Sequence, residues 1–479
     1  MRWPGVLAAV LVAVSSFFAT ARAGQPIDVP ALLAEAEALR EENAVPAVGL
    51  ALADQQEVLW SGAFGIADLA TGRKADADTL FRIGSITKTF TAAALLMLQE
   101  DGRLQLDDPV RRHVPDPPYA NPWESTHPIT VAQLLEHTSG FQDWTRAEFD
   151  LNDPAPLSLD QGLAFQPESR TARWKPGLHS VYSNSNYGVA GLVLERAAGE
   201  SYESFITRRL FEALDMRSAS LLAEDTPFDR LATGYDRDGR TPIPYWHFIQ
   251  RPAGTINASP HEMAALVQML LNRGIYRERR VLAAESVERM ETPRTSLAAR
   301  SGLDYGYGLG NYTWYRNGFL FHGHGGDADG YLSHFAYCRE LGVGYFVTIN
   351  AYQPAVLRQL RAIIESRLTR GRAASPPPPP ARLDRERLLR YTGRYQSAAW
   401  RFAWQTPEER EGQIMTIRLA RGGYLVTETA SGRRGALIQV SERHFRRGRE
   451  HGATSAFVED GGQLYFVEDD SWVKTGELD

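Results

Sequence analysis

Five consecutive prolines, Pro376–Pro380, divide the chain into two parts of unequal length. Each proline holds φ near about −65° and has no N–H, so such a run fits neither a helix interior nor a central strand. We therefore predict a semi-rigid linker over 371–382. It would join a large unit at 24–370 to a small one at 383–479. A chain of 479 residues is also long for a single hydrophobic core.

The large unit has strand-like runs near both of its ends and helical patterns between them. Residues 47–53 and 58–66 form one predicted hairpin, and residues 331–337 and 343–349 form another. Most of 85–300 has helical periodicity. This order favours an α+β fold, in which an antiparallel sheet is built from both chain ends, flanked by helices, and carries a helical insertion.

The small unit alternates apolar and polar residues with the period of a strand. Met415, Ile417 and Leu419 share one face of such a run, which follows a short helical stretch at 383–389. Glycine pairs at 422–423 and 461–462 stand where hairpin turns are expected. The pattern predicts a small all-β domain, closed into a barrel.

The first residues have the pattern of an export signal. Arg2 precedes an apolar run at 6–18, and Ala21-Arg22-Ala23 has the small-x-small form of a signal peptidase site. We predict a signal peptide over 1–23, a periplasmic or secreted protein, and no membrane anchor after cleavage. A retained N-terminal anchor is the alternative.

Composition excludes several functions. A net charge of −6 leaves no basic field for nucleic acid, so we expect no nucleic-acid partner. The single cysteine, Cys338, excludes an internal disulfide and a cysteine-cluster metal site. Only four of the 52 basic residues are lysines, which leaves few candidates for a functional amine.

The most informative of those lysines is Lys88, in a Ser-x-x-Lys motif with Ser85. The run that starts at Ser85 is predicted to be a helix. Residues three apart share a helix face, so the amine would lie beside the hydroxyl. An alcohol becomes a good nucleophile when a base removes its proton, and a lysine with a lowered pKa is such a base. A helix cap beside a solvated lysine is the structural alternative.

A second Ser-x-x-Lys, at Ser471 and Lys474, lies in strand-like sequence. In a strand, residues three apart point to opposite faces, so we set this pair aside.

Two further motifs follow Ser85 along the chain. Tyr182-Ser183-Asn184 offers a phenol and an amide, or else a polar turn before a helix. His324-Gly325-Gly326 follows a strand-like run, and its glycines permit close approach of a substrate backbone. A register starting at His322 is the alternative, but it would put a histidine where glycine is needed.

Other short motifs occur in the same order as in a known group of enzymes. The sequence resembles the class C β-lactamase-related serine hydrolases, a group that includes DD-peptidases, D-amino acid amidases and esterases. The resemblance covers about residues 45–350. Besides the three motifs above, it rests on the segments 65–68, 104–109, 134–140, 214–216 and 307–310.

The resemblance implies an acyl-enzyme mechanism. Ser85 would be the nucleophile and Lys88 the base or proton shuttle. Tyr182 would act as general base and as donor to the leaving group, and Asn184 would orient Lys88 and bind the substrate. The barrel resembles the lipocalin-like appendages of some relatives.

The strand motif is implied to bind the substrate through His324, Gly325 and Gly326. The oxyanion hole would be the backbone N–H groups of Ser85 and Asp327. The β-lactamases of the group have a lysine where this chain has His324, so the motif resembles the esterase and peptidase branches more closely.

No cofactor is expected. His322, His324, Asp327 and Asp329 carry metal-binding groups, but the implied chemistry needs no metal. We therefore expect a serine hydrolase acting on esters or amides, with a small-molecule or peptide substrate. A true β-lactamase and a non-catalytic penicillin-recognising or scaffold protein are the alternatives. The sequence leaves the oligomeric state open.

Overall fold

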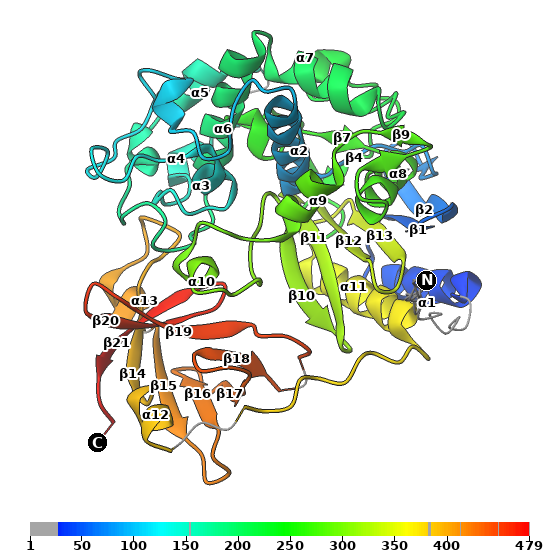
Figure 1. Cartoon of the computed structure of the whole chain (residues 1–479). Helices are drawn as coiled ribbons and strands as arrows, with labels where there is room; N and C mark the ends of the chain where they lie inside the picture. The colour runs from blue at the N-terminus through cyan, green and yellow to red at the C-terminus, as the bar shows by residue number, and fades with distance from the viewer. Residues whose placement is uncertain (1–26, 153–154, 382–384, 412, 449, 479) are drawn as a thin grey trace, which may run out of the picture.

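The computed structural model describes residues 27–152, 155–381, 385–411, 413–448 and 450–478. The predicted signal peptide, 1–23, lies outside the described residues. Figure 1 shows a large body of helices and sheet above a smaller β-barrel, with the segment 371–381 running along the outside between them. Among the described residues, no helix combines the length and apolar character needed to cross a membrane.

A seven-stranded sheet forms the centre of the large body, and its order confirms the predicted α+β fold. Strands from the start of the chain pair with strands from residues 312–349, because β1 lies between β2 and β13. Every neighbouring pair is antiparallel. In spatial order the strands are β10 (Tyr312–Arg316), β11 (Phe319–Ala328), β12 (Tyr331–Cys338), β13 (Val343–Ile349), β1 (Ala47–Asp54), β2 (Val58–Asp68) and β3 (Arg73–Lys74).

Helices cover both faces of this sheet. Along β1, Leu50 and Leu52 belong to the core shared with helices α1 (Val29–Glu42) and α11 (Pro354–Thr369). The intervening Ala51 belongs to the opposite core, which contains helix α8 (Pro260–Leu271). This alternation is the period of two expected of a strand buried on both faces.

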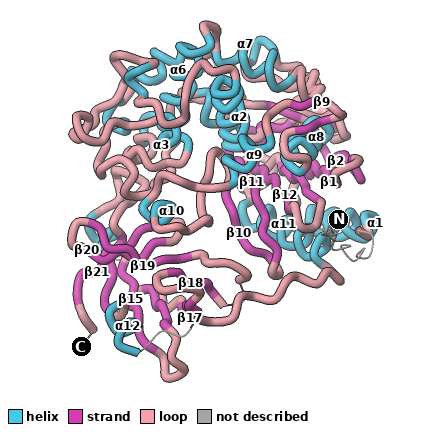
Figure 2. The backbone as a smooth tube through the Cα atoms, in the orientation of Figure 1, coloured by secondary structure: helices cyan, strands magenta, loops and turns pink. Residues whose placement is uncertain are grey.

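The helical insertion lies over the second face (Figure 2). Its α-helices are α2 (Thr87–Glu100), α3 (Val131–Leu135), α4 (Arg146–Phe149), α5 (Leu159–Ala164), α6 (Asn184–Ala198), α7 (Tyr202–Ile206), α9 (Ala284–Glu291) and α10 (Leu297–Arg300). Short two-residue strands pair within it, namely β4 (Phe81–Arg82) with β7 (Asn257–Ala258), β5 (Gly234–Tyr235) with β6 (Pro242–Ile243), and β8 (Ile275–Tyr276) with β9 (Arg279–Arg280).

The turn that carries Ser85 lies against strand β11. Residues Gly84–Ile86 form a 3₁₀ turn, and α2 begins at Thr87, two residues later than the sequence predicts. A Cβ on Gly326 would lie 1.9 Å from the carbonyl oxygen of Ile83. Since side-chain carbons never approach an oxygen so closely, only glycine allows this strand to pack against the turn.

The C-terminal part forms the predicted closed barrel, in which consecutive strands are neighbours. Its interior is apolar and includes Tyr395, Met415 and Phe457, with Leu388 from helix α12 (Arg385–Arg390). The strands are β14 (Gly393–Ser397), β15 (Ile414–Leu419), β16 (Leu425–Thr429), β17 (Arg434–Gln439), β18 (His444–Arg447), β19 (Ser455–Asp460), β20 (Gln463–Val467) and β21 (Ser471–Gly476).

The outer wall of the barrel packs on the large body. Ala456 and Val458, which point out of β19, join Leu297 and Ala298 of α10 in one apolar cluster. Figure 1 shows α10 between the helical region and β19. This contact brings the segment 398–406, which follows β14 and is called the arm below, to the large body.

We predict that alanine is tolerated at Gly325 and not at Gly326. A Cβ on Gly325 would meet nothing closer than 3.7 Å, whereas the one on Gly326 would collide with backbone. Gly326→Ala should lower the free energy of unfolding by about 1–3 kcal/mol. Gly325→Ala should change it by about 0.5 kcal/mol or less. Urea unfolding followed by tryptophan fluorescence measures both, and equal stabilities would contradict the packing described.

Candidate active site

The amine of Lys88 is fully buried and lies among three oxygen atoms. It is 3.0 Å from Oγ of Ser85, 2.8 Å from Oδ1 of Asn184 and 2.6 Å from the carbonyl oxygen of Ala253. Burial lowers the pKa of Lys88 well below its usual value of 10.5. The structure therefore places a base with a lowered pKa beside the hydroxyl of Ser85.

Tyr182 also contacts the Ser85 side chain, through a hydrogen bond. Its ring centroid is 5.0 Å from Nζ of Lys88. Burial raises the pKa of Tyr182 well above 10, and a hydrogen bond with the Ser85 side chain opposes that rise only in part. A neutral phenol can donate a proton, so this surrounding favours the donor role of Tyr182 over a resting phenolate.

A buried carboxylate, Asp143, holds Asn184 at the start of α6. Its Oδ1 accepts hydrogen bonds from the backbone N–H groups of Asn184 and Trp144, both at 2.8 Å. Its Oδ2 lies 3.3 Å from the Asn184 side-chain nitrogen. With that nitrogen held, the amide oxygen of Asn184 faces Lys88. Sequence reasoning missed Asp143, which follows the 134–140 motif without a recognisable pattern of its own.

His324 projects from β11 into the site. Its Nε2 is 2.9 Å from the hydroxyl of Tyr307, and its Nδ1 is 2.5 Å from the Gly325 carbonyl oxygen. Burial, and then the charge of Lys88, lowers the pKa of His324 to about 3. The imidazole is therefore neutral and offers no cation to a substrate carboxylate.

Of the other members of the His322–Asp329 cluster, Asp327 and Asp329 line the same cleft as Ser85, and the Asp327 carboxylate accepts a hydrogen bond from the Tyr352 hydroxyl at 3.1 Å. The ring of His322 lies 5.6 Å from that of Tyr337, and His322 is not among the residues that line the Ser85 cleft. The Asp329 carboxylate accepts a hydrogen bond from Trp246, 2.8 Å away. Within the part of the chain that the structure describes, no three His, Cys, Asp or Glu side chains are arranged to hold a metal ion. Cys338 is a buried free thiol in β12.

The backbone of Asp327 lies beside the Ser85 turn. Gly84 has a φ of +54°, and a Cβ placed there would be 2.5 Å from the Asp327 nitrogen. The N–H groups of Ser85 and Asp327 thus come from adjacent segments, as an oxyanion hole requires.

Ser85 opens into a cleft of about 280 Å³. One part of its wall is aromatic, which suits an apolar acyl group, and another part is charged, with Glu148, Asp327, Asp329 and Arg401. The aromatic lining residues are Trp144, Phe149, Trp246, Phe248 and Tyr352.

His137 lies behind Tyr182 in a left-handed backbone conformation, with a φ of +57°. Its ring centroid is 4.3 Å from that of Tyr182. Its Nδ1 accepts hydrogen bonds from the Ser183 N–H at 3.2 Å and the Asn186 amide at 3.1 Å. The imidazole therefore positions the loop that carries Tyr182.

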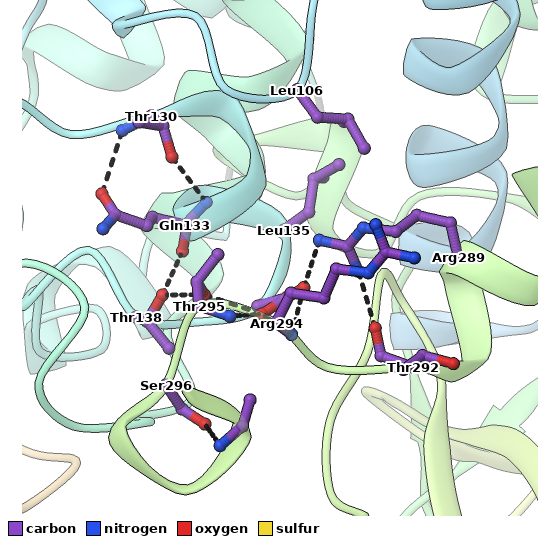
Figure 3. A network of polar contacts seen from close by, with 12 residues as sticks. Leu106, Thr130, Gln133, Leu135, Thr138, Arg289, Thr292, Arg294, Thr295 and Ser296 are labelled. Carbon is purple, nitrogen blue, oxygen red and sulfur yellow. Dashed lines mark hydrogen bonds and ion pairs between the residues drawn. The ribbon is translucent and has the colours of Figure 1, made fainter. Parts of the chain in front are cut away.

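The residue before it, Glu136, anchors the segment that leads to α10. Its buried carboxylate accepts hydrogen bonds from Arg289 at 2.5 Å and from the Arg294 and Thr295 N–H groups at 2.9 and 2.7 Å. Figure 3 shows these partners converging below α3. The same network therefore fixes the loop behind Tyr182 and the helix on which the barrel docks.

The barrel itself supplies a side chain to the site. Nε of Arg401, in the arm, donates to Oδ2 of Asp143 at 2.8 Å. The guanidinium carbon lies 4.6 Å from the Tyr182 ring centroid, and Arg401 lines the same cleft as Ser85. Sequence reasoning missed Arg401, since nothing in the small unit indicates which of its arginines reaches across.

Comparison with known proteins identifies the family of the chain. The family described as Beta-lactamase matches residues 33–368. Protein flp of Staphylococcus aureus (strain MRSA252) is 28% identical over 235 residues, which are 48% of this chain and 46% of flp. The chain thus spans about half the length of the curated relatives it matches.

Solved structures share the fold. The octameric penicillin-binding protein homologue from Pyrococcus abyssi has a TM-score of 0.60 at 23% identity, over 93% of this chain and all of that one. A D-stereospecific amidohydrolase from Streptomyces sp. has a TM-score of 0.55 at 26% identity, over 70% of this chain and 98% of that one. The family match includes all seven strands of the sheet, and the chain belongs to the Beta-lactamase family.

Proposed function

We propose that this protein is an exported serine hydrolase that cleaves esters or amides through an acyl-enzyme. The observation that carries the proposal is the 3.0 Å contact between the Lys88 amine and the Ser85 hydroxyl, in a buried site where the Tyr182 ring lies 5.0 Å from the same amine. Export rests on the predicted signal peptide at 1–23.

The proposed reaction has two steps, acylation of Ser85 and hydrolysis of the acyl-enzyme. In the first, Lys88 takes the Ser85 proton while Oγ bonds to the substrate carbonyl carbon. The N–H groups of Ser85 and Asp327 bind the oxyanion. The bond to the leaving group then breaks, and Tyr182 passes a proton to that group. Protonated Lys88 in turn gives its proton to Tyr182. In the second step, water attacks the ester carbonyl and gives a proton to Lys88; the bond between Oγ and the acyl carbon breaks, Oγ takes the proton back from Lys88, and the acid is released.

The cleft points to the substrate class. Its aromatic side chains suit an apolar or aromatic acyl group, and the neutral His324 lacks the charge that a lysine at this strand position would offer to the carboxylate of a penicillin. A small ester or a D-amino acid amide or peptide fits these features. The similarity to a D-stereospecific amidohydrolase supports the D-configuration.

Ser85→Ala should abolish hydrolysis of p-nitrophenyl esters, because no other group replaces the nucleophile. We expect a loss of about 10⁴-fold or more. Ser471→Ala, in the second Ser-x-x-Lys, is the matched control and should keep wild-type rates, since Lys474 there binds Glu477 at 2.8 Å. Mass spectrometry after a fluorophosphonate should find the adduct on Ser85. Equal rates for wild type and Ser85→Ala would favour a non-catalytic scaffold.

The pH profile should reflect the lowered pKa of Lys88. Since the neutral amine is the active form, kcat/KM should rise through that pKa and level off well below pH 10.5. Lys88→Arg keeps a permanent cation and should lose about 10²–10⁴-fold at every pH. A wild-type profile that still rises towards pH 10.5 would show that the amine is not the base.

Nitrocefin separates this function from that of a true β-lactamase. We expect slow turnover of nitrocefin relative to a p-nitrophenyl ester, and no gain in His324→Lys, because position 324 is 1% exposed and hydrogen-bonded to Tyr307. Rapid nitrocefin turnover that improves further in His324→Lys would identify a β-lactamase instead.

A further inference from the structure

A continuous line of polar contacts runs from the barrel to the nucleophile. The guanidinium of Arg401 holds the Asp143 carboxylate, with Nη2 2.6 Å and Nε 2.8 Å from the same oxygen. Asp143 holds both nitrogens of Asn184, whose Oδ1 lies 2.8 Å from the Lys88 amine. That amine reaches Ser85.

The arm that carries Arg401 is fixed at several points. The N–H of Asp143 donates to the Arg401 carbonyl oxygen at 2.8 Å, so the two residues are joined through backbone as well as side chain. The ring centroids of Trp400 and Trp174 lie 5.2 Å apart, and that of Phe402 lies 6.2 Å from Phe149 of α4. The guanidinium is therefore held in place by packing.

The ion pair between Arg401 and Asp143 also changes the electrostatics around Lys88. The Asp143 side chain has no exposed surface, whereas that of Arg401 is 43% exposed and remains in contact with solvent. A lone carboxylate buried there would stabilise the protonated form of Lys88. The nearby cation offsets that effect.

We propose that Arg401 is a positioning residue of the active site, through which the C-terminal barrel keeps Asp143 neutralised, Asn184 oriented and the Lys88 amine free to act as a base. The inference rests on the function proposed above. Arg401 acts through Asp143 and Asn184 and takes no part in the bonds made or broken.

The electrostatics around Lys88 agree with this role. Burial is the largest influence on the pKa of Lys88 and lowers it; the Asp143 charge raises it, and the Arg401 charge lowers it. The other groups facing the amine are uncharged: burial lowers the pKa values of His137 and His324 and raises those of Tyr182 and Tyr187. Loss of the Arg401 cation therefore raises the pKa of Lys88, because the repulsion that offsets the Asp143 charge is removed.

The test is the pH dependence of p-nitrophenyl acetate hydrolysis by the full chain, since this ester has no charge for Arg401 to bind. In Arg401→Gln, the acidic limb of kcat/KM should move up by about 1–2 pH units. The rate on that limb should fall about 10-fold or more. Arg401→Lys keeps the cation and should move the limb back towards wild type, as should the double variant Arg401→Gln/Asp143→Asn, which removes both charges.

Arg410→Gln is the matched control. Arg410 belongs to α13 (Pro407–Glu411), close to the arm, and its guanidinium lies 4.5 Å from the Trp400 ring centroid. Its side chain donates to the Ala403 carbonyl oxygen at 3.2 Å. Its loss should leave the pH profile unchanged.

A second measurement does not need turnover. With only four lysines in the chain, ¹⁵N-lysine labelling gives a short list of side-chain signals, and Lys88→Arg assigns the one of interest. That signal alone should titrate about 1–2 pH units higher in Arg401→Gln.

The outcomes separate the two proposals. An inactive wild type, equal to Ser85→Ala, would overturn the hydrolase function. An active wild type whose acidic limb and Lys88 titration coincide with those of Arg401→Gln would overturn only the role of Arg401. The role of Arg401 would also be overturned if Arg401→Gln makes the 371–382 linker more sensitive to protease, a sign that the barrel has undocked, while the acidic limb of kcat/KM does not move. A change confined to KM for anionic esters would identify a substrate anchor instead.

Discussion

The arrangement of the site depends on a lysine amine removed from water. Lys88 is in contact with oxygens from three separate segments, the Ser85 turn, the start of α6 and the residue Ala253. A solvated lysine is protonated at neutral pH and cannot accept a proton. Burial lowers the pKa of the amine, because the protonated form loses more hydration free energy than the neutral form when it leaves water. The sheet, the insertion and the loop that carries Tyr182 all help to exclude water from this one atom.

Close backbone packing gives the site its geometry. Strand β11 lies against the Ser85 turn because Gly84 and Gly326 have no Cβ to keep them apart. The strand motif and the nucleophile thereby come from adjacent segments although they are far apart in the chain. Behind them, His137 supports the Tyr182 loop and Glu136 anchors the approach to α10. The barrel docks on α10, so the same set of contacts also directs the arm.

Much of the fold follows from local pattern. Continuous strand-like runs located the hairpins of the sheet, because a strand buried on both faces needs apolar residues along its whole length. The proline run separated the barrel, since prolines cannot continue either kind of element. The start of α2 differed by two residues, because Ser85 lies on a 3₁₀ turn pressed against β11. That contact belongs to the tertiary structure, and helix propensity does not include it.

The sequence by itself placed Ser85 beside Lys88, because residues three apart in a helical segment lie on the same face whatever the rest of the chain does. It also identified Tyr182, Asn184 and His324 as candidate active-site residues. Only the tertiary structure decided that His324 is buried and neutral, and that Asp143 and Arg401 complete the site. Arg401 is 258 residues from its carboxylate partner. The contact between Arg401 and Asp143 depends on how the barrel docks on the large unit, and no local spacing in the sequence predicts that docking.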